Sequence, residues 1–269
     1  MDVIRISIGT EPMQYIASEV LKSSILRRTS QPVEFSESWT PNGGWHPAMQ
    51  ELPRLPRGTK FNVWRWCVPG VYANRGKAIY LDADQVVLDD IAKLWNALLP
   101  GNTFAAVCNA QGIFGKKKPE PGAVQTSVMV MDCDLCRWDI RELSARVVRG
   151  EMEYRDLMQA RFIHRSDIQE LPPEWNHFGI HTEGTKLLHW SHVASQPYRK
   201  PNHPTAHIFR EELHAAIRAG HVTRGAVAHA CMKGHLCMDW GNDMPHPAPV
   251  PPTRPAGLPP DAVLSTEQD

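Results

Sequence analysis

The chain has 269 residues, of which 42% are hydrophobic, and it contains nine Trp, which is enough apolar material for the core of one α/β domain. Its 29 Lys and Arg balance its 29 Asp and Glu, so no basic field favours nucleic acid or an anionic membrane surface. We find no secretory signal and no apolar run of about 18 residues, and six cysteines in such a chain favour free thiols. We therefore expect a cytoplasmic protein without a transmembrane segment or a nucleic-acid partner.

Strand and helix patterns alternate along the chain. Short apolar or alternating runs predict strands over residues 3–8, 33–35, 78–81, 103–108 and 127–131. Apolar residues at helical spacing predict helices over residues 13–28, 61–71, 91–96, 135–149, 154–163 and 206–219. This alternation predicts an α/β fold with a mainly parallel central sheet flanked by helices, in which ligands bind beyond the carboxyl ends of the strands.

The strand predicted over residues 78–81 leads directly into Asp82-Ala83-Asp84. Side chains two apart in an extended chain point to the same face, so the two carboxylates can converge. Two close anions repel each other, and a hard divalent cation, which prefers oxygen ligands, removes that repulsion. The pattern therefore indicates a site for Mg²⁺ or Mn²⁺ against a substrate phosphate. Aspartates also form turns and helix caps, which is our interpretation of Asp89 and Asp90.

Other clusters leave two interpretations open. The run Lys116-Lys117-Lys118 is either part of a solvated loop or a charged flap near an acceptor or diphosphate. Cys133 and Cys136 have a redox or zinc spacing, but they also fit an ordinary strand-to-helix connection. A denser set is compatible with structural zinc or with buried thiols beside surface histidines: His229, Cys231, His235 and Cys237.

The chain divides into two parts by composition. Residues 1–242 are predicted to form one domain. Residues 243–269 are dominated by proline and lack apolar periodicity, so they cannot bury enough surface to offset their ordering entropy. We predict that this second part is a disordered tail.

The aspartate motif belongs to a longer pattern, from Tyr80 to Ile91 and then Leu94-Trp95, that resembles glycosyltransferase family 8. There, an apolar strand leads into Leu-Asp-x-Asp, followed by apolar residues, Asp-Ile and Leu-Trp. Further segments resemble the family in the same order along the chain: Arg5 to Pro12, Thr59-Lys60-Phe61 with Arg65, Ser127 to Asp132, Leu171 to Asn176, and Leu187 to Trp190. The resemblance implies a GT-A-type domain with a Rossmann-like nucleotide-binding half, and a hexosyltransferase type of enzyme.

The resemblance also implies a metal site and a donor site. Asp82, Asp84 and His189 would bind the metal, and manganese suits a set with imidazole better than magnesium does. The donor would contact residues from four segments: Gly9, Thr10, Glu11, Arg65, Asp82, Ala83, Gln125, Thr126 and Ser127. Arg65 would contact the donor sugar or orient a carboxylate. Asp156 lies where the family places an acidic residue near the reacting carbon, which makes it the second catalytic candidate.

Two features depart from the family pattern. Leu157 stands where the family usually has a glutamine beside the acidic residue. After its metal-binding histidine the family commonly has a glycine and then Lys-Pro-Trp, whose lysine reaches the diphosphate. This chain has His192 and then Gln196-Pro197-Tyr198. Either Arg199 or Lys200 supplies the missing charge, or the loop binds the donor differently.

These observations predict a metal-dependent glycosyltransferase. It would move a sugar from a nucleotide-diphosphate sugar, most readily a uridine one, to a glycan, lipid or protein acceptor, and the resemblance implies retention of anomeric configuration. Two alternatives remain: a non-catalytic nucleotide-sugar-binding relative, and another metal-dependent enzyme such as a nucleotidyltransferase or phosphohydrolase. Variable connections usually set acceptor specificity, here residues 37–57 and those beyond residue 200.

Overall fold

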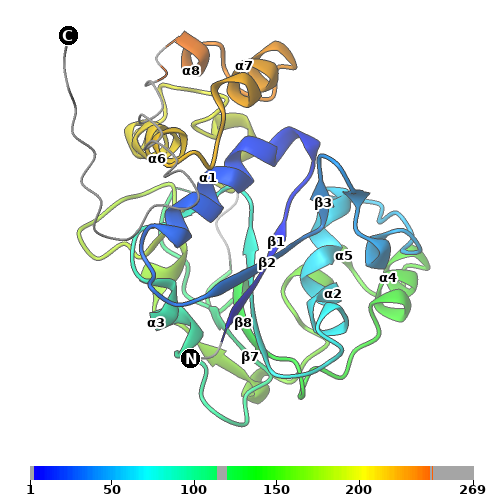
Figure 1. Cartoon of the computed structure of the whole chain (residues 1–269). Helices are drawn as coiled ribbons and strands as arrows, with labels where there is room; N and C mark the ends of the chain where they lie inside the picture. Colours follow the sequence, from blue (N-terminus) through cyan, green and yellow to red (C-terminus); the bar gives the residue numbers. More distant parts are fainter. Residues whose placement is uncertain (1–2, 114–119, 243, 245–269) are drawn as a thin grey trace, which may run out of the picture.

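A computed structural model describes residues 3–113, 120–242 and 244. The strands of its central sheet are β1 (Ile4–Gly9), β2 (Val33–Glu37), β5 (Lys77–Asp82), β7 (Phe104–Val107), β8 (Gln125–Asp132) and β9 (Ile168–Glu170). Their order across the sheet is β2-β1-β5-β8-β7-β9 (Figure 1). The pairs β1–β2, β1–β5 and β7–β9 are parallel, whereas β8 runs antiparallel to both of its neighbours. The predicted mainly parallel α/β sheet is confirmed.

Two smaller sheets accompany the central one. The first contains β6 (Gln85–Val87), β10 (His177–Phe178) and β11 (Leu187–His189), in the order β10-β11-β6. The second pairs β3 (Trp39–Thr40) with β4 (Gly44–Trp45). The antiparallel register of β11 on β6 sets His189 opposite Gln85, directly after the aspartate motif. This small sheet therefore brings together two segments that are about a hundred residues apart in the chain.

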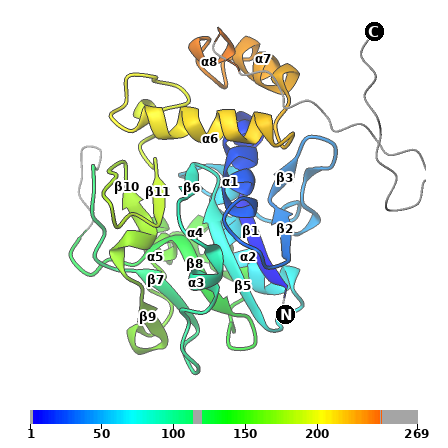
Figure 2. The same cartoon turned by 60° about the vertical axis from the view of Figure 1, so that its left-hand side comes forward.

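The helices cover both faces of the central sheet (Figures 1 and 2). They are α1 (Tyr15–Leu26), α2 (Trp64–Val71), α3 (Ile91–Trp95), α4 (Ile140–Val148), α5 (Tyr154–Met158), α6 (Ala206–Arg218), α7 (Arg224–Met232) and α8 (Asp239–Asn242). Short 3-10 turns cover Pro12–Gln14, Pro47–Met49, Lys60–Val63, Arg165–Asp167, Pro173–Asn176 and Val193–Ser195.

Two predicted helices are shorter in the structure than in the sequence pattern. The helix predicted from residue 135 begins at Ile140, where Asp139 caps it by accepting a hydrogen bond from the Arg141 amide at 2.8 Å. The helix predicted to reach residue 163 ends at Met158, because Ala160 adopts a left-handed backbone conformation with φ of 54°. Asp90 caps α3 through a 2.9 Å bond from the Ala92 amide, which confirms the structural interpretation of that aspartate.

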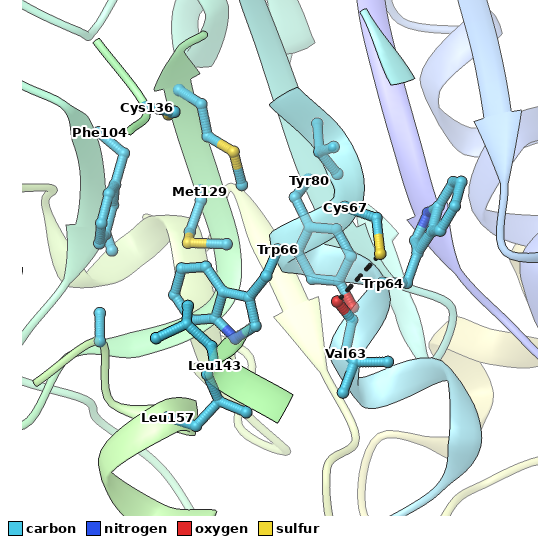
Figure 3. Close-up of a cluster of buried hydrophobic side chains, with 14 of the residues drawn as sticks. Val63, Trp64, Trp66, Cys67, Tyr80, Phe104, Met129, Cys136, Leu143 and Leu157 are labelled. Atoms are coloured by element: carbon cyan, nitrogen blue, oxygen red, sulfur yellow. Dashed lines mark hydrogen bonds between the residues drawn. The ribbon is translucent and has the colours of Figure 1, made fainter. Parts of the chain in front are cut away.

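The core consists of three apolar clusters. One lies between the sheet and α2, α4 and α5, where Trp66, Tyr80 and Met129 pack with Phe104 and Leu143 (Figure 3). A second lies on the opposite face, under α1 and α3. The third joins α6, α7 and α8 to the rest of the domain through large aromatic side chains: Trp190, Tyr198, Phe209 and Trp240. The α6–α8 segment is thus part of the folded domain.

The remaining sequence features have mainly structural explanations. All six cysteines are free thiols. Burial raises the pKa of Cys133 to about 12 and raises that of Cys136 as well, so neither thiol has the thiolate character of a reactive redox cysteine. None of the helices in the described part of the chain has the length and apolar character needed to cross a bilayer. The predicted lysine flap and the predicted tail lie outside the described residues, apart from Met244, which packs against the third cluster.

Candidate metal and donor site

The three predicted metal ligands lie together at the carboxyl end of β5. This strand is buried from Ala78 onward and ends at Asp82; the chain then bends through Asp84 into β6. Ligand atoms of Asp82, Asp84 and His189 all lie within 4.8 Å of one another. Among the described residues this is the one group whose ligand atoms converge in this way, and the set His229, Cys231, His235 and Cys237 does not converge so.

Asp82 is held by a buried network. The Arg65 guanidinium donates to both of its carboxylate oxygens at 3.0 and 3.3 Å, and the Tyr80 hydroxyl donates to Oδ1 as well. Arg65 also donates to Thr126 Oγ1 at 2.8 Å and to the Asn62 carbonyl at 3.0 Å. Burial raises the pKa of Asp82 because it outweighs the opposing effect of Arg65. A divalent cation beside Asp82 would therefore add to the effect of Arg65 and stabilise the ionised carboxylate.

His189 is oriented by a second set of hydrogen bonds. Its Nδ1 lies 2.9 Å from Oδ1 of Asn176, whose Nδ2 donates to Ser127 Oγ at 3.0 Å. Since an amide oxygen only accepts hydrogen bonds, Nδ1 carries the proton and Nε2 presents a lone pair. That Nε2 lies 3.3 Å from Asp84 Oδ1, a buried oxygen to which none of the described residues donates a hydrogen bond. Two lone-pair atoms facing each other fit a shared cation, so the residues present suit a divalent metal.

Gln196 accounts for part of the unusual loop after His189. Its Nε2 donates to Asp84 Oδ2 at 2.8 Å, and its side chain is fully buried. The neutral amide at this position therefore holds a proposed metal ligand. Arg199, three residues later, lines the adjoining cavity, whereas Lys200 is exposed and does not line it.

A cavity of about 840 Å³ opens beside the carboxylates. Most of the predicted site residues line it: Glu11, Arg65, Asp82, Asp84, Gln125, Thr126, Ser127 and His189. Further lining residues had no signal in the sequence, and they include Asn62, Tyr154, Gln159 and Phe178. Gln159 has a buried carbonyl oxygen that receives no hydrogen bond from the described part of the chain, which makes it a candidate ligand contact.

Four predicted residues are not brought to the cavity. Thr10 and Ala83 are fully buried, and their amides donate to Ser38 Oγ at 2.8 Å and to the Gly9 carbonyl at 3.0 Å. Gly9 packs against the Tyr80 hydroxyl, which leaves no space for a β-carbon. Gly9, Thr10 and Ala83 are therefore packed beneath the side chains that line the cavity and do not line it themselves.

Asp156 is the fourth. Its carboxylate pairs with Arg161 at 3.1 Å, while Tyr154, Arg155, Met158 and Gln159 from the same short helical segment line the cavity. Asp156 itself does not line the cavity, so its catalytic role stays a prediction from the family resemblance.

Solved structures share this arrangement of elements. The galactosyltransferase LgtC, solved with donor and acceptor sugar analogs, is 16% identical, covers 79% of this chain and 95% of its own, and superposes with a TM-score of 0.55. The glycosyltransferase GlyE of Streptococcus pneumoniae TIGR4 is 14% identical, covers 87% and 64%, and gives a TM-score of 0.59. The fold is that of the GT-A glycosyltransferases.

The sequence comparisons specify the family. Residues 10–198 match the model of Glycosyl transferase family 8, and the chain belongs to that family of transferase enzymes. The "Probable galacturonosyltransferase-like 7" of Arabidopsis thaliana is 28% identical over 153 residues, which are 43% of this chain and 41% of the relative. The "Probable galacturonosyltransferase-like 9" of the same plant is 28% identical over 154 residues. The match thus spans about two fifths of the length of these curated relatives.

Proposed function

We propose that this enzyme transfers a hexosyl group from a nucleotide-diphosphate sugar, most readily a uridine one, with a divalent cation bound by Asp82, Asp84 and His189. The observation that carries the proposal is the facing pair of Asp84 Oδ1 and His189 Nε2 beside the large cavity. When bound, the cation neutralises the diphosphate as it leaves. Manganese is our proposed ion because the ligand set mixes imidazole with carboxylate.

In this proposal Arg65 is a positioning residue. Its donors are already engaged by Asp82, Thr126 and a backbone carbonyl, so few remain for a sugar. Of the two roles that the sequence left open, orientation of a carboxylate is therefore better supported than direct donor contact. Gln125, Ser127 and the Gln159 carbonyl offer hydrogen-bonding groups along the same wall, and we assign them to sugar hydroxyls.

We further propose that Arg199 supplies the charge that the family obtains from a lysine. Three arginines line the cavity, and two of them are committed elsewhere: Arg65 to Asp82 at 3.0 Å, and Arg155 to Glu120 at 2.8 Å. Within the described part of the chain, Arg199 has no carboxylate within ion-pair distance, although Glu11 lies near enough for Arg199 to oppose the rise in its pKa caused by burial. Arg199 is thus available to bind a leaving diphosphate.

The relatives support a hexosyl or hexuronosyl donor, since the names of two of them refer to galacturonosyl transfer and one solved structure is a galactosyltransferase. Retention of anomeric configuration is supported by family membership.

A thermal-shift panel of nucleoside diphosphates, each with and without Mn²⁺, tests the donor site. A ligand at about 100 times its Kd adds about 2.7 kcal/mol of stability, which raises Tm measurably. We expect a rise that requires both one nucleotide and Mn²⁺. Incubation with the matching nucleotide sugar should then release the nucleoside diphosphate. Release of a nucleoside monophosphate or of inorganic phosphate would indicate a nucleotidyltransferase or phosphohydrolase and would overturn the proposal.

A further inference from the structure

A second cavity, of about 610 Å³, lies beside the donor cavity, and the proposed donor site does not use it. Its wall is mainly apolar and includes Tyr15, Ile16, Trp39 and Ala230. Met13 lines both cavities, so the two cavities adjoin each other at this residue.

Three segments that are distant in the chain form this cavity: the start of α1, the β3 region and α7, which Figure 1 shows near one another. The rings of Tyr15 and Trp39 meet edge to face, with their centroids 6.3 Å apart. Trp39 belongs to the variable connection over residues 37–57, and α7 lies beyond residue 198, where the family match ends. The cavity thus combines the two regions in which acceptor specificity is expected.

The rim of this cavity is basic. It carries His229, Lys233 and His235, and no carboxylate side chain is among the described residues that line it. None of these three side chains has a hydrogen bond or ion pair to another described residue. Burial, together with the positive charges of Arg199 and Lys233, lowers the pKa of His235. Arg199, which lines the donor cavity, therefore lies near enough to this rim to act on His235.

We propose that this cavity is an acceptor subsite that binds an apolar chain or ring joined to the acceptor sugar through a phosphate group. The apolar part would pack on Tyr15 and Trp39, and the phosphate would lie against Lys233. A phosphate suits this lining better than a single carboxylate does, because Lys233 attracts its larger charge and imidazole N–H groups can donate to its additional acceptor oxygens. The assignment of the bound molecule as the acceptor rests on the proposed function, whereas the binding of an apolar phosphate in this cavity does not.

Isothermal titration calorimetry with three probes tests the subsite directly: octyl phosphate, tetraethylene glycol monooctyl ether and inorganic phosphate. Each buried methylene adds a factor of about 4 to affinity, so octyl phosphate should bind at least about 100-fold more tightly than inorganic phosphate. It should also bind more tightly than the neutral ether with the same chain. Equal binding of the two octyl compounds, or absence of binding, would overturn the proposal.

Two variants locate the binding. Lys233→Glu should weaken octyl phosphate about fivefold or more, with little effect on the neutral ether, whereas the exposed control Arg218→Glu should change neither. Trp39→Ala should weaken both octyl compounds. If Lys233→Glu and Arg218→Glu behave alike, or if UDP with Mn²⁺ displaces octyl phosphate, the probe is not bound in this cavity. Failure of the nucleotide panel with octyl phosphate still bound would instead reject the donor proposal and leave the second site in place.

Discussion

Asn176 Oδ1 accepts the Nδ1 proton of His189 at 2.9 Å and thereby determines which imidazole nitrogen faces Asp84. The same amide donates to Ser127 Oγ at 3.0 Å, so its orientation is fixed from both ends. Asp84 lies in the bend after β5, and His189 lies in β11. Asn176, from the 3-10 turn Pro173–Asn176, orients the His189 ring toward Asp84. Metal affinity should therefore depend on a residue that does not touch the metal.

We predict that Asn176→Leu lowers Mn²⁺ affinity by about 10- to 100-fold, the usual effect of losing such an outer-shell partner. Asn176→Asp should largely preserve affinity, since a carboxylate accepts from both His189 and Ser127. The measurement is a Mn²⁺ titration followed by electron paramagnetic resonance or calorimetry. Equal losses in the two variants would show that position 176 acts through packing and not through this hydrogen bond.

Substitution of a proposed metal ligand should lower affinity more than substitution of Asn176 does. Asp84→Asn and His189→Ala should each lower Mn²⁺-dependent nucleotide affinity by more than about 100-fold, because a direct ligand contributes more than an outer-shell partner. Asp89→Asn is the matched control: it removes a carboxylate from the same stretch, where Asp89 pairs with Lys93 at 2.6 Å on the surface. Nucleotide binding that Asp84→Asn leaves intact would remove Asp84 from the site.

The site residues that the sequence predicts most directly are those that lie close together along the chain. Asp82 and Asp84 are visible because a buried strand and a two-residue spacing are local features. His189 required the family resemblance, since its approach to Asp84 depends on the pairing of β11 with β6. Gln196 reaches Asp84 across 112 positions, a contact that no local pattern encodes. Its residue type appeared in the sequence only as an unexplained departure.

Backbone details account for local differences between the predicted and the observed structure. A left-handed residue such as Ala160 is not signalled by its residue type, so the helix that contains Asp156 was predicted too long. Thr10 and Ala83 belong to the correct segments, but burial turns them away from the cavity. The mainly parallel sheet and the helices on both of its faces followed from periodicity, because those features depend on many residues at once.

Gly9 should be intolerant of any side chain. A β-carbon there would meet the Tyr80 hydroxyl and lie 3.0 Å from Phe61, and Tyr80 in turn holds Asp82. We expect Gly9→Ala to destabilise the fold by about 1–3 kcal/mol, as overpacking does, and to weaken Mn²⁺ binding as well. Urea unfolding provides the measurement. Gly70→Ala in α2, where nothing lies within 4 Å, is the control and should be neutral or stabilising.

If Arg199 binds the diphosphate, Arg199→Ala should lower kcat by about 10- to 100-fold, the value of one or two charge-assisted hydrogen bonds. Arg199→Lys should restore part of the rate. Arg155→Ala is the matched control, since Arg155 lines the same cavity but is paired with Glu120. A loss of rate confined to Lys200→Ala would move the role to that exposed neighbour.

The response to metal should depend on pH with a definite sign. Burial raises the pKa of Asp82 above its ordinary value of 3.8, so the folded protein without metal binds this proton more tightly than the unfolded chain does. Ionised Asp82 therefore lowers stability at neutral pH, and that cost disappears as pH falls through the raised pKa. With Mn²⁺ bound the ionised form is the stabilised one, so acidification removes stability instead. The gap in Tm between the protein with and without Mn²⁺ should be largest near pH 7 and should narrow as pH falls through the raised pKa. A gap that stayed constant from pH 7.5 down to pH 3.8 would mean that Asp82 does not ligate the ion.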